Sequence, residues 1–182
     1  MIYFTADTHF YHNNILRFDN RPWETMEEMN EALRRRWNYR VHNNDTVYIL
    51  GDFSWKSSGA ALDFLKTLKG KKRLITGNHD TNSKEFYDLF ESVKDFDRIK
   101  VPVRDGTTRT CILSHYFMPL YPGHWNGAIH LHGHSHNTKE HMEELRIAAE
   151  LNRKGFPTEI YNVGCMHWNY QPVTLDEMRE KR

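Results

Sequence analysis

Hydrophobic and polar positions in the first half of the chain switch between two periods. Three short apolar runs, rich in β-branched and aromatic residues, have the length and composition of buried strands. Two longer segments carry apolar residues at the three- and four-residue spacing of an amphipathic helix. Strands that alternate with helices in this way indicate a parallel α/β arrangement. The predicted strands are residues 2–6, 46–50 and 73–76, and the predicted helices are residues 26–40 and 59–68.

Local signals mark the ends of these helices. Thr25, with Glu28 three residues later, forms a capping-box pattern in front of the first helix. Gly70 follows the second helix and stops it. A weaker helical pattern covers residues 83–91.

The second half of the chain is richer in strand patterns. Asp105-Gly106 separates two β-rich runs and predicts a hairpin. Thr174 with Glu177 forms a second capping-box pattern, which predicts a short C-terminal helix. No linker interrupts these patterns, so we expect a single domain over residues 1–182. The predicted strands are residues 99–103, 108–113, 128–132 and 159–163, with a loop over 116–127 and a helix over 138–153 that stops at Gly155.

Composition narrows the class of protein. The 182 residues carry a formal net charge of only +1, which argues against stable binding of duplex nucleic acid. No run approaches the roughly 20 apolar residues of a membrane span, and no secretory signal opens the chain. Cys111 and Cys165 form neither a closely spaced pair nor a disulfide framework. We therefore expect a soluble, cytoplasmic protein.

Residues that bind metals or carry protons follow five of the predicted strands. The carboxyl ends of parallel strands are where ligands collect. Carboxylates, an amide oxygen and imidazoles, without a thiolate, favour two hard or borderline divalent ions. Asp52 is the natural bridge between two ions because it stands alone at its strand end. The residues are Asp7 and His9, Asp52, Asn78 with His79, His115, and His134 with His136.

These residues lie in motifs that resemble a known family. Asp-x-His, Gly-Asp, Gly-Asn-His-Asp, an isolated His and Gly-His-x-His occur in this order between Asp7 and His136. This order and spacing resemble the calcineurin-like metallophosphoesterases. The resemblance implies an α/β fold of that family, a four-layer α-β-β-α sandwich with two mixed β-sheets and helices outside. Residues 18–23 and 161–164 further resemble a small bacterial and phage branch of the family.

The resemblance also implies how the ligands divide between two metals. One metal would be held by Asp7, His9, Asp52 and His136, and the other by Asp52, Asn78, His115 and His134. Two such cations lower the pKa of a bridging water towards about 7, which supplies a hydroxide nucleophile at neutral pH. Manganese is the first choice of metal, with Fe, Zn or Ni as alternatives, because this mixture of ligands accepts all four.

Further residues are candidates for catalysis and substrate binding. His79 is predicted to protonate the leaving oxygen or to stabilise the transition state, with Asp80 orienting it. Arg21 is a candidate to grip a substrate phosphate, although a contact within the loop that enters the helix is the stronger alternative. His12 is a candidate for the pocket, with a surface position as the alternative. His130 and His132 are expected to pack behind the ligands, and His124, Trp125, His167 and Trp168 are candidates for the rim or the core.

The leading hypothesis is a dinuclear-metal-dependent phosphoester hydrolase, either a phosphodiesterase or a phosphatase, acting on small or nucleotide-like substrates. Family phosphatases that act on proteins often continue Gly-Asp with a nearby Asp-Arg pair, whereas Gly51-Asp52 is followed here by Phe53-Ser54-Trp55. One alternative is a metal-dependent nuclease, for which Arg34 to Arg36 and Lys69 to Arg73 are the basic candidates. The other is a non-catalytic scaffold that binds proteins. The sequence leaves the physiological substrate and the oligomeric state open.

Overall fold

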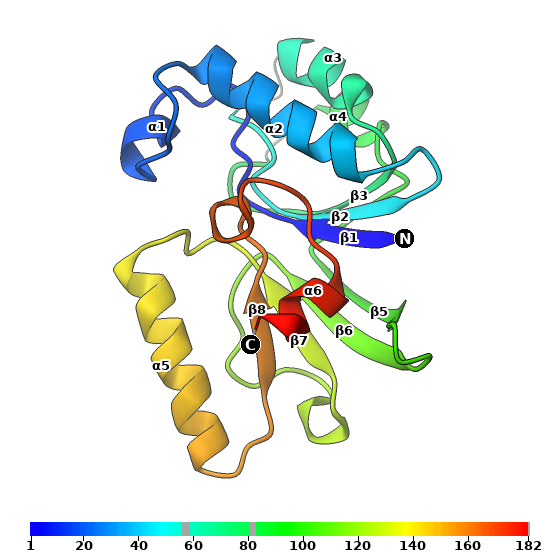
Figure 1. Cartoon of the computed structure of the whole chain (residues 1–182), viewed down its shortest axis with the longest axis vertical. Helices are drawn as coiled ribbons and strands as arrows, with labels where there is room; N and C mark the ends of the chain where they lie inside the picture. The colour runs from blue at the N-terminus through cyan, green and yellow to red at the C-terminus, as the bar shows by residue number, and fades with distance from the viewer. Residues whose placement is uncertain (56–58, 81–82, 182) are drawn as a thin grey trace.

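Two four-stranded sheets form the centre of the molecule (Figure 1). The structure, a computed structural model, describes residues 1–55, 59–80 and 83–181. The first sheet is parallel throughout, whereas the second combines one antiparallel with two parallel pairings. The first sheet has the order β1 (Ile2–Thr5), β2 (Thr46–Leu50), β3 (Lys71–Ile75) and β4 (Ser92–Lys94). The second has the order β5 (Phe96–Pro102), β6 (Thr108–Ser114), β7 (Ile129–His132) and β8 (Glu159–Asn162).

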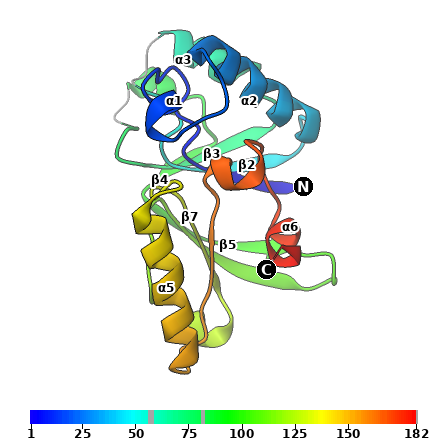
Figure 2. The same ribbon diagram turned by 60° about the vertical axis from the view of Figure 1, so that its left-hand side comes forward.

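Helices lie outside the two sheets, as the views in Figures 1 and 2 agree. Helices α1 to α4 share a core with the outer side of the first sheet, and the long α5 stands beside the second sheet. The expected four-layer sandwich is therefore confirmed, with the difference that only the second sheet is mixed. The helices are α1 (Ile15–Phe18), α2 (Met26–Arg40), α3 (Gly59–Thr67), α4 (Lys84–Tyr87), α5 (Lys139–Arg153) and α6 (Leu175–Glu180).

The first sheet is buried on both faces. On β2, Val47 and Ile49 pack into the core beneath the helices, whereas Tyr48 and Leu50 pack into the core between the sheets. Successive side chains of a strand point to opposite faces, so a strand that is covered on both sides needs apolar residues throughout. This is why residues 46–50 form one continuous apolar run.

Helix α2 follows its sequence signals closely. The Thr25 side chain accepts a hydrogen bond from the backbone N–H of Glu28, which caps the first turn. Met29, Leu33 and Trp37 share one face and are buried in the core beneath the helices. The expected helix over residues 26–40 is therefore confirmed. The second capping box, at Thr174 and Glu177, is also present.

A loop covers much of the outer face of the second sheet. Ile112 and Ile160 point outward from β6 and β8 and pack with Tyr121, near the middle of the loop between β6 and β7, and with Ala128 at its end. The ring of His130 links this loop to the sheet. Its Nδ1 donates to Ile112 O of β6 over 3.1 Å, and its Nε2 accepts from Met118 N of the loop over 3.1 Å. The expected packing role of His130 is thus confirmed.

Short elements depart from the expectations. The helix expected over residues 83–91 is only one turn, Lys84–Tyr87, and the following residues form the edge strand β4, Ser92–Lys94. The one-turn helix α1 was not expected. A helix of one turn contains too few positions to show a helical period, which explains why both helices were misjudged.

The buried His130 makes a prediction for acid stability. Burial lowers the pKa of His130 to about 4, below its ordinary value near 6.5. The neutral ring of His130 therefore contributes fully to the free energy of unfolding above pH 6.5. This contribution, up to about 3 kcal/mol, is lost as the pH falls from 6.5 towards 4. Urea unfolding in the presence of a chelator, at pH 7 and pH 4.5, should show a smaller loss of stability on acidification for His130→Gln than for the wild type.

The exposed His42 provides the matched control. His42→Gln should lose as much stability on acidification as the wild type. An equal loss in His130→Gln would contradict the buried, neutral state of His130.

Candidate metal centre

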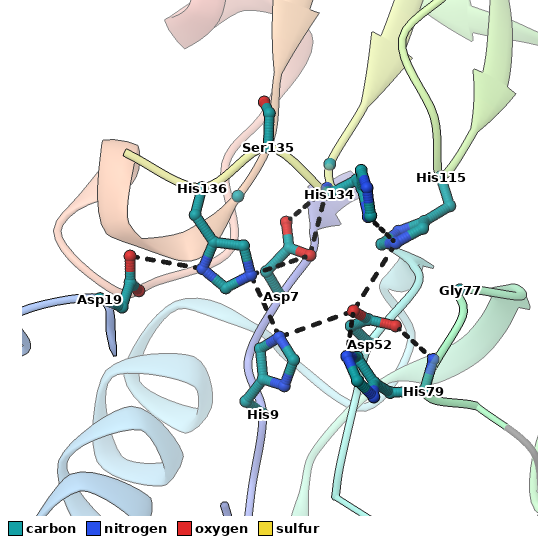
Figure 3. A network of polar contacts seen from close by, with 12 residues as sticks. Asp7, His9, Asp19, Asp52, Gly77, His79, His115, His134, Ser135 and His136 are labelled. Carbon is teal, nitrogen blue, oxygen red and sulfur yellow. Dashed lines mark hydrogen bonds and ion pairs between the residues drawn. The ribbon is translucent and has the colours of Figure 1, made fainter. Parts of the chain in front are cut away.

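The candidate ligands come together where the two sheets meet. In the first sheet β1, β2 and β3 are parallel, and in the second sheet β6 and β7 are parallel, so within each sheet the ligand-bearing ends lie on one edge. Backbone bonds join the two edges, since Ala6 N donates to Val163 O and Cys165 N donates to Ala6 O. Side chains separated by up to 129 residues in the sequence therefore face one space (Figure 3).

The first group consists of Asp7, His9 and His136, whose candidate ligand atoms all lie within 4.8 Å of one another. The Nε2 atoms of His9 and His136 are 3.2 Å apart. The Nε2 atom of His136 lies 3.8 Å from Asp7 Oδ1. Two carboxyl-end loops, after β1 and β7, supply the whole group.

The second group consists of Asp52, His115 and His134, again within 4.8 Å. His115 Nε2 lies 3.2 Å from His134 Nδ1 and 3.1 Å from Asn78 Oδ1. The side-chain oxygen of Asn78 is therefore placed where it could be the fourth ligand of this group.

Asp52 stands between the two groups. Its Oδ2 atom lies 3.6 Å from His9 Nε2 and 3.6 Å from His115 Nε2. Its other oxygen accepts a hydrogen bond from His79 N over 2.9 Å, which fixes the direction of the carboxylate. This is the geometry expected of a carboxylate that bridges two ions.

The chemistry of the donor atoms fits cations. His115 Nδ1 donates to the carbonyl oxygen of Leu50 over 2.8 Å, so in the neutral ring Nε2 carries a lone pair. That lone pair faces the oxygen atoms of Asn78 and Asp52, which are acceptors as well. Acceptors that converge in a buried space are satisfied by a positive ion between them.

Burial also sets the charge of the ligands. It raises the pKa of Asp7 to about 8, against the opposing effect of His136. It lowers the pKa of His9 well below its usual value. A divalent cation favours the carboxylate and the unprotonated imidazole, so it would balance a site that is otherwise short of positive charge.

The backbone at the ligands is unusual. A positive φ in a non-glycine residue is uncommon and costs about 1 kcal/mol or more. It occurs at five of the seven candidate ligands, which are Asp7 (φ 55), His9 (φ 49), Asp52 (φ 54), His134 (φ 71) and His136 (φ 48). The strand-end loops thus hold strained residues side by side, as functional sites often do.

Glycines allow the loops to approach one another. A Cβ atom on Gly77 would lie 2.3 Å from Asp52 Oδ1, and one on Gly51 (φ +87) would lie 2.2 Å from His115 Nδ1. No side chain fits at these distances, so both positions require glycine.

His79 lies at the open side of the centre. Its side chain is 34% exposed, and its Nε2 is 3.9 Å from Asp52 Oδ2. The ring centroid is 5.4 Å from that of His9. An imidazole in this position can reach both the candidate ligands and a group that enters from solvent.

Asp80 does not orient His79, and this prediction is wrong. The Asp80 carboxylate is buried and accepts hydrogen bonds from the backbone N–H groups of Asp52, Phe53 and Gly77, at 2.7, 3.0 and 2.9 Å. Asp80 thus ties the loop after β2 to the loop after β3. Burial raises the pKa of Asp80 to about 6, partly offset by these hydrogen bonds.

The predicted contact of Arg21 with substrate is also wrong. The Arg21 side chain is 0% exposed, and its guanidinium donates to Asp7 O over 2.6 Å and to Thr8 O over 2.7 Å. Its Nε donates to Asp19 Oδ2 over 2.9 Å. Of these contacts, the one with Asp19 lies within the loop that enters α2, as the alternative expected, and the other two reach across to the loop after β1.

Asp19 is a residue that sequence reasoning missed. Its Oδ1 atom lies 3.3 Å from His136 Nδ1, on the side of the ring away from the candidate metal position (Figure 3). Burial opposes ionisation of Asp19, but the hydrogen bonds and charges of His136 and Arg21 outweigh it and lower its pKa. Residues 18–23 stood out in the sequence as a motif, but the sequence did not show that Asp19 would contact His136.

His12 is buried beside the centre rather than on the surface. Its ring stacks on Trp55 with centroids 4.2 Å apart, and its Nδ1 lies 3.3 Å from His9 Nδ1. It therefore supports His9 from behind, and a direct contact with substrate stays a prediction.

Ser135 and its neighbours hold the loop that carries His134 and His136. Ser135 Oγ donates to Glu144 of α5 over 2.6 Å and accepts from Asn162 of β8 over 2.9 Å. His167 Nε2 lies 3.0 Å from His136 O, so His167 contacts this loop. Trp125 instead packs against Phe156 and is 62% exposed, so the core, one of its two expected positions, is wrong.

A two-sheet α/β domain with two ligand groups at its strand ends has the architecture of a metallophosphoesterase. The family model of calcineurin-like phosphoesterases matches residues 1–168. The chain therefore belongs to this family, as its motifs indicated, and family membership supports metal-dependent phosphoester hydrolysis.

Relatives share nearly the whole chain. The chain is 34% identical to the uncharacterized protein MJ1445 of Methanocaldococcus jannaschii over 177 residues, which are 96% of this chain and 87% of that protein. It is 31% identical to the Gene 66 protein of Mycobacterium phage D29 over 204 residues, with 98% of this chain and 94% of that protein covered. The solved structure of protein AQ665 of unknown function, from Aquifex aeolicus, superposes with a TM-score of 0.72 at 26% identity, covering 100% and 99% of the two chains.

The structural role of Asp80 makes a prediction for stability, with His79 as the comparison. Asp80→Asn leaves buried backbone donors facing an amide, so it should lower the free energy of unfolding by about 2 kcal/mol. His79→Ala, at a partly exposed position, should change it by less than about 0.5 kcal/mol. Urea unfolding of the metal-free chain measures both values, and an unchanged midpoint for Asp80→Asn would refute the structural role of Asp80.

Proposed function

We propose that this protein is a dinuclear-metal-dependent phosphoester hydrolase that acts on small or nucleotide-like substrates. The observation that carries the proposal is the position of Asp52 Oδ2, which is 3.6 Å from one imidazole nitrogen of each ligand group. A carboxylate placed in this way belongs to both groups and supports a paired centre rather than two separate sites.

Each part of the centre has a defined task in this proposal. Asp7, His9, Asp52 and His136 hold one divalent ion, and Asp52, Asn78, His115 and His134 hold the other. The ions, when bound, would supply an activated water and neutralise charge on the phosphoryl oxygens. His79 donates a proton to the leaving oxygen, since its imidazole is partly exposed and lies next to Asp52.

Aromatic side chains at the open side support a nucleotide or aryl substrate. Trp55 is 38% exposed, and its ring lies 5.0 Å from that of His79. Tyr116 is 48% exposed, and its ring lies 4.7 Å from that of His134. Exposed rings on either side of the centre offer surfaces on which a planar group can stack.

The basic residues do not favour a nuclease. Arg34 pairs with Glu31, and Arg73 pairs with Glu91. Lys72 donates to the carbonyl oxygens of residues 68 and 70. Lys72 and Arg73 also lie at the beginning of β3, whereas the candidate ligand Asn78 follows its end. These cations are thus engaged with the protein itself, and a complete set of ligands argues against a scaffold without catalysis.

The metal and the compartment follow from the residue types. We retain manganese as the first choice, with Fe, Zn or Ni as alternatives. Cys111 and Cys165 are both free and buried, which supports a reducing cytoplasm. Among the described residues, no helix is long and apolar enough to cross a membrane.

The test is hydrolysis by the metal-free chain after addition of Mn²⁺. We expect turnover of bis(4-nitrophenyl) phosphate, 4-nitrophenyl phosphate or both, and its loss with excess chelator. Asp52→Asn should abolish turnover because it removes the shared carboxylate charge. Absence of hydrolysis of both substrates with Mn²⁺, Fe²⁺, Zn²⁺ and Ni²⁺ would refute the proposed function.

His79→Ala tests the proton donor. The variant should keep its fold and bind Mn²⁺ as the wild type does, whereas kcat on the phosphodiester should fall by about 10²- to 10³-fold. Calorimetric titration with Mn²⁺ and steady-state kinetics measure the two effects separately. Equal kcat in the variant and the wild type would remove His79 from the mechanism.

A further inference from the structure

One ligand of the centre has a buried carboxylate behind it. Asp19 Oδ1 lies 3.3 Å from His136 Nδ1, and the Asp19 side chain is 2% exposed. Among the described residues Asp19 Oδ1 has no hydrogen-bond partner with suitable angles, so its contact with His136 is at an ion-pair distance. A negative oxygen at this distance favours the imidazole proton on Nδ1, which leaves the lone pair on Nε2. The lone pair then faces Asp7 and His9, which are the partners of His136 in the first group.

Arg21 joins Asp19 to the backbone of the same group. Its Nε donates to Asp19 Oδ2 over 2.9 Å, and its terminal nitrogens donate to Asp7 O and Thr8 O over 2.6 and 2.7 Å. One buried guanidinium therefore fixes both the carboxylate behind His136 and the strained residue Asp7 (φ 55). A planar fork with several donors is needed for this, so lysine is not equivalent.

The second group has a different partner. His115 Nδ1 donates over 2.8 Å to the backbone carbonyl of Leu50, and this acceptor is neutral, whereas Asp19 is a carboxylate. A carboxylate makes the imidazole it accepts from more basic than a carbonyl does, and the loss of such a partner costs about 10- to 100-fold in metal affinity.

We propose that Asp19 and Arg21 are positioning residues that make the Asp7–His9–His136 group bind its divalent ion more tightly than the Asp52–His115–His134 group. The proposal rests on the proposed function, because it requires that both groups bind metal. It gives Asp19 and Arg21 a role in the order of metal loading, apart from any contact with substrate.

The test is calorimetric titration of the metal-free full chain with Mn²⁺ alone. The wild type should show a tight and a weak step, and Asp19→Asn should weaken the tight step by about 10- to 100-fold while it leaves the weak step within about twofold. The change keeps the shape of the side chain and removes its charge. Arg21→Lys should also weaken the tight step, and it serves as the second variant should Asp19→Asn fail to fold.

Variants in which one ligand group is disabled show which group produces the tight titration step. With the second group disabled by His134→Ala, Asp19→Asn should weaken the remaining site. With the first group disabled by His136→Ala, it should have no effect. Asp45→Asn is the matched control, because Asp45 is a buried aspartate that pairs with the N-terminal amine and His42 N, outside the centre.

The outcomes separate the two proposals. A wild type that binds none of Mn²⁺, Fe²⁺, Zn²⁺ and Ni²⁺ would refute the proposed function itself. A wild type with two steps, combined with equal weakening of both steps or of neither in Asp19→Asn, would refute the role of Asp19 alone.

Discussion

The carboxylate of Asp52 lies between two sets of imidazoles, and this contact organises the centre. Its Oδ2 atom is 3.6 Å from a nitrogen of His9 and from a nitrogen of His115, which belong to different sheets. Lone pairs that converge in a buried space repel one another unless positive charge lies among them. The fold therefore has to hold its strand ends together against this repulsion.

Two buried charged residues meet that requirement by binding backbone. Asp80 accepts from three N–H groups in the loops after β2 and β3, and Arg21 donates to two carbonyl groups in the loop after β1. Five candidate ligands have positive φ, at a cost of about 1 kcal/mol or more each, so the loops need such restraints. Glycine at positions 51 and 77 lets the restrained loops pack within contact distance.

The sequence predicted the strands and the ligand groups because both depend on local order. Apolar runs that end in Asp, Asn or His place those residues at one edge of a parallel sheet, whatever the loops do. Contacts between residues that are far apart in the sequence could not be predicted in this way. Asp19 meets a histidine 117 residues away, and Asp80 was assigned to His79 because neighbours in sequence were taken as neighbours in space. The core, as one expected position of Trp125, was wrong because nothing local shows that its loop folds over the outer face of the second sheet.

The residues divide the centre into a closed back and an open front. Asp7, His9 and His115 are at most 2% exposed, and the side chains of Asp19, which contacts His136, and of Arg21, which binds the Asp7 backbone, are equally buried. His79 and Trp55, by contrast, are about one-third exposed, and Asn78 is exposed. A substrate can approach only from the exposed side, where it would meet the imidazole of His79 before it reaches Asp52. The charged residues at the back can therefore contact only the ligands, whereas in the proposed hydrolysis only the residues at the front can reach a leaving group.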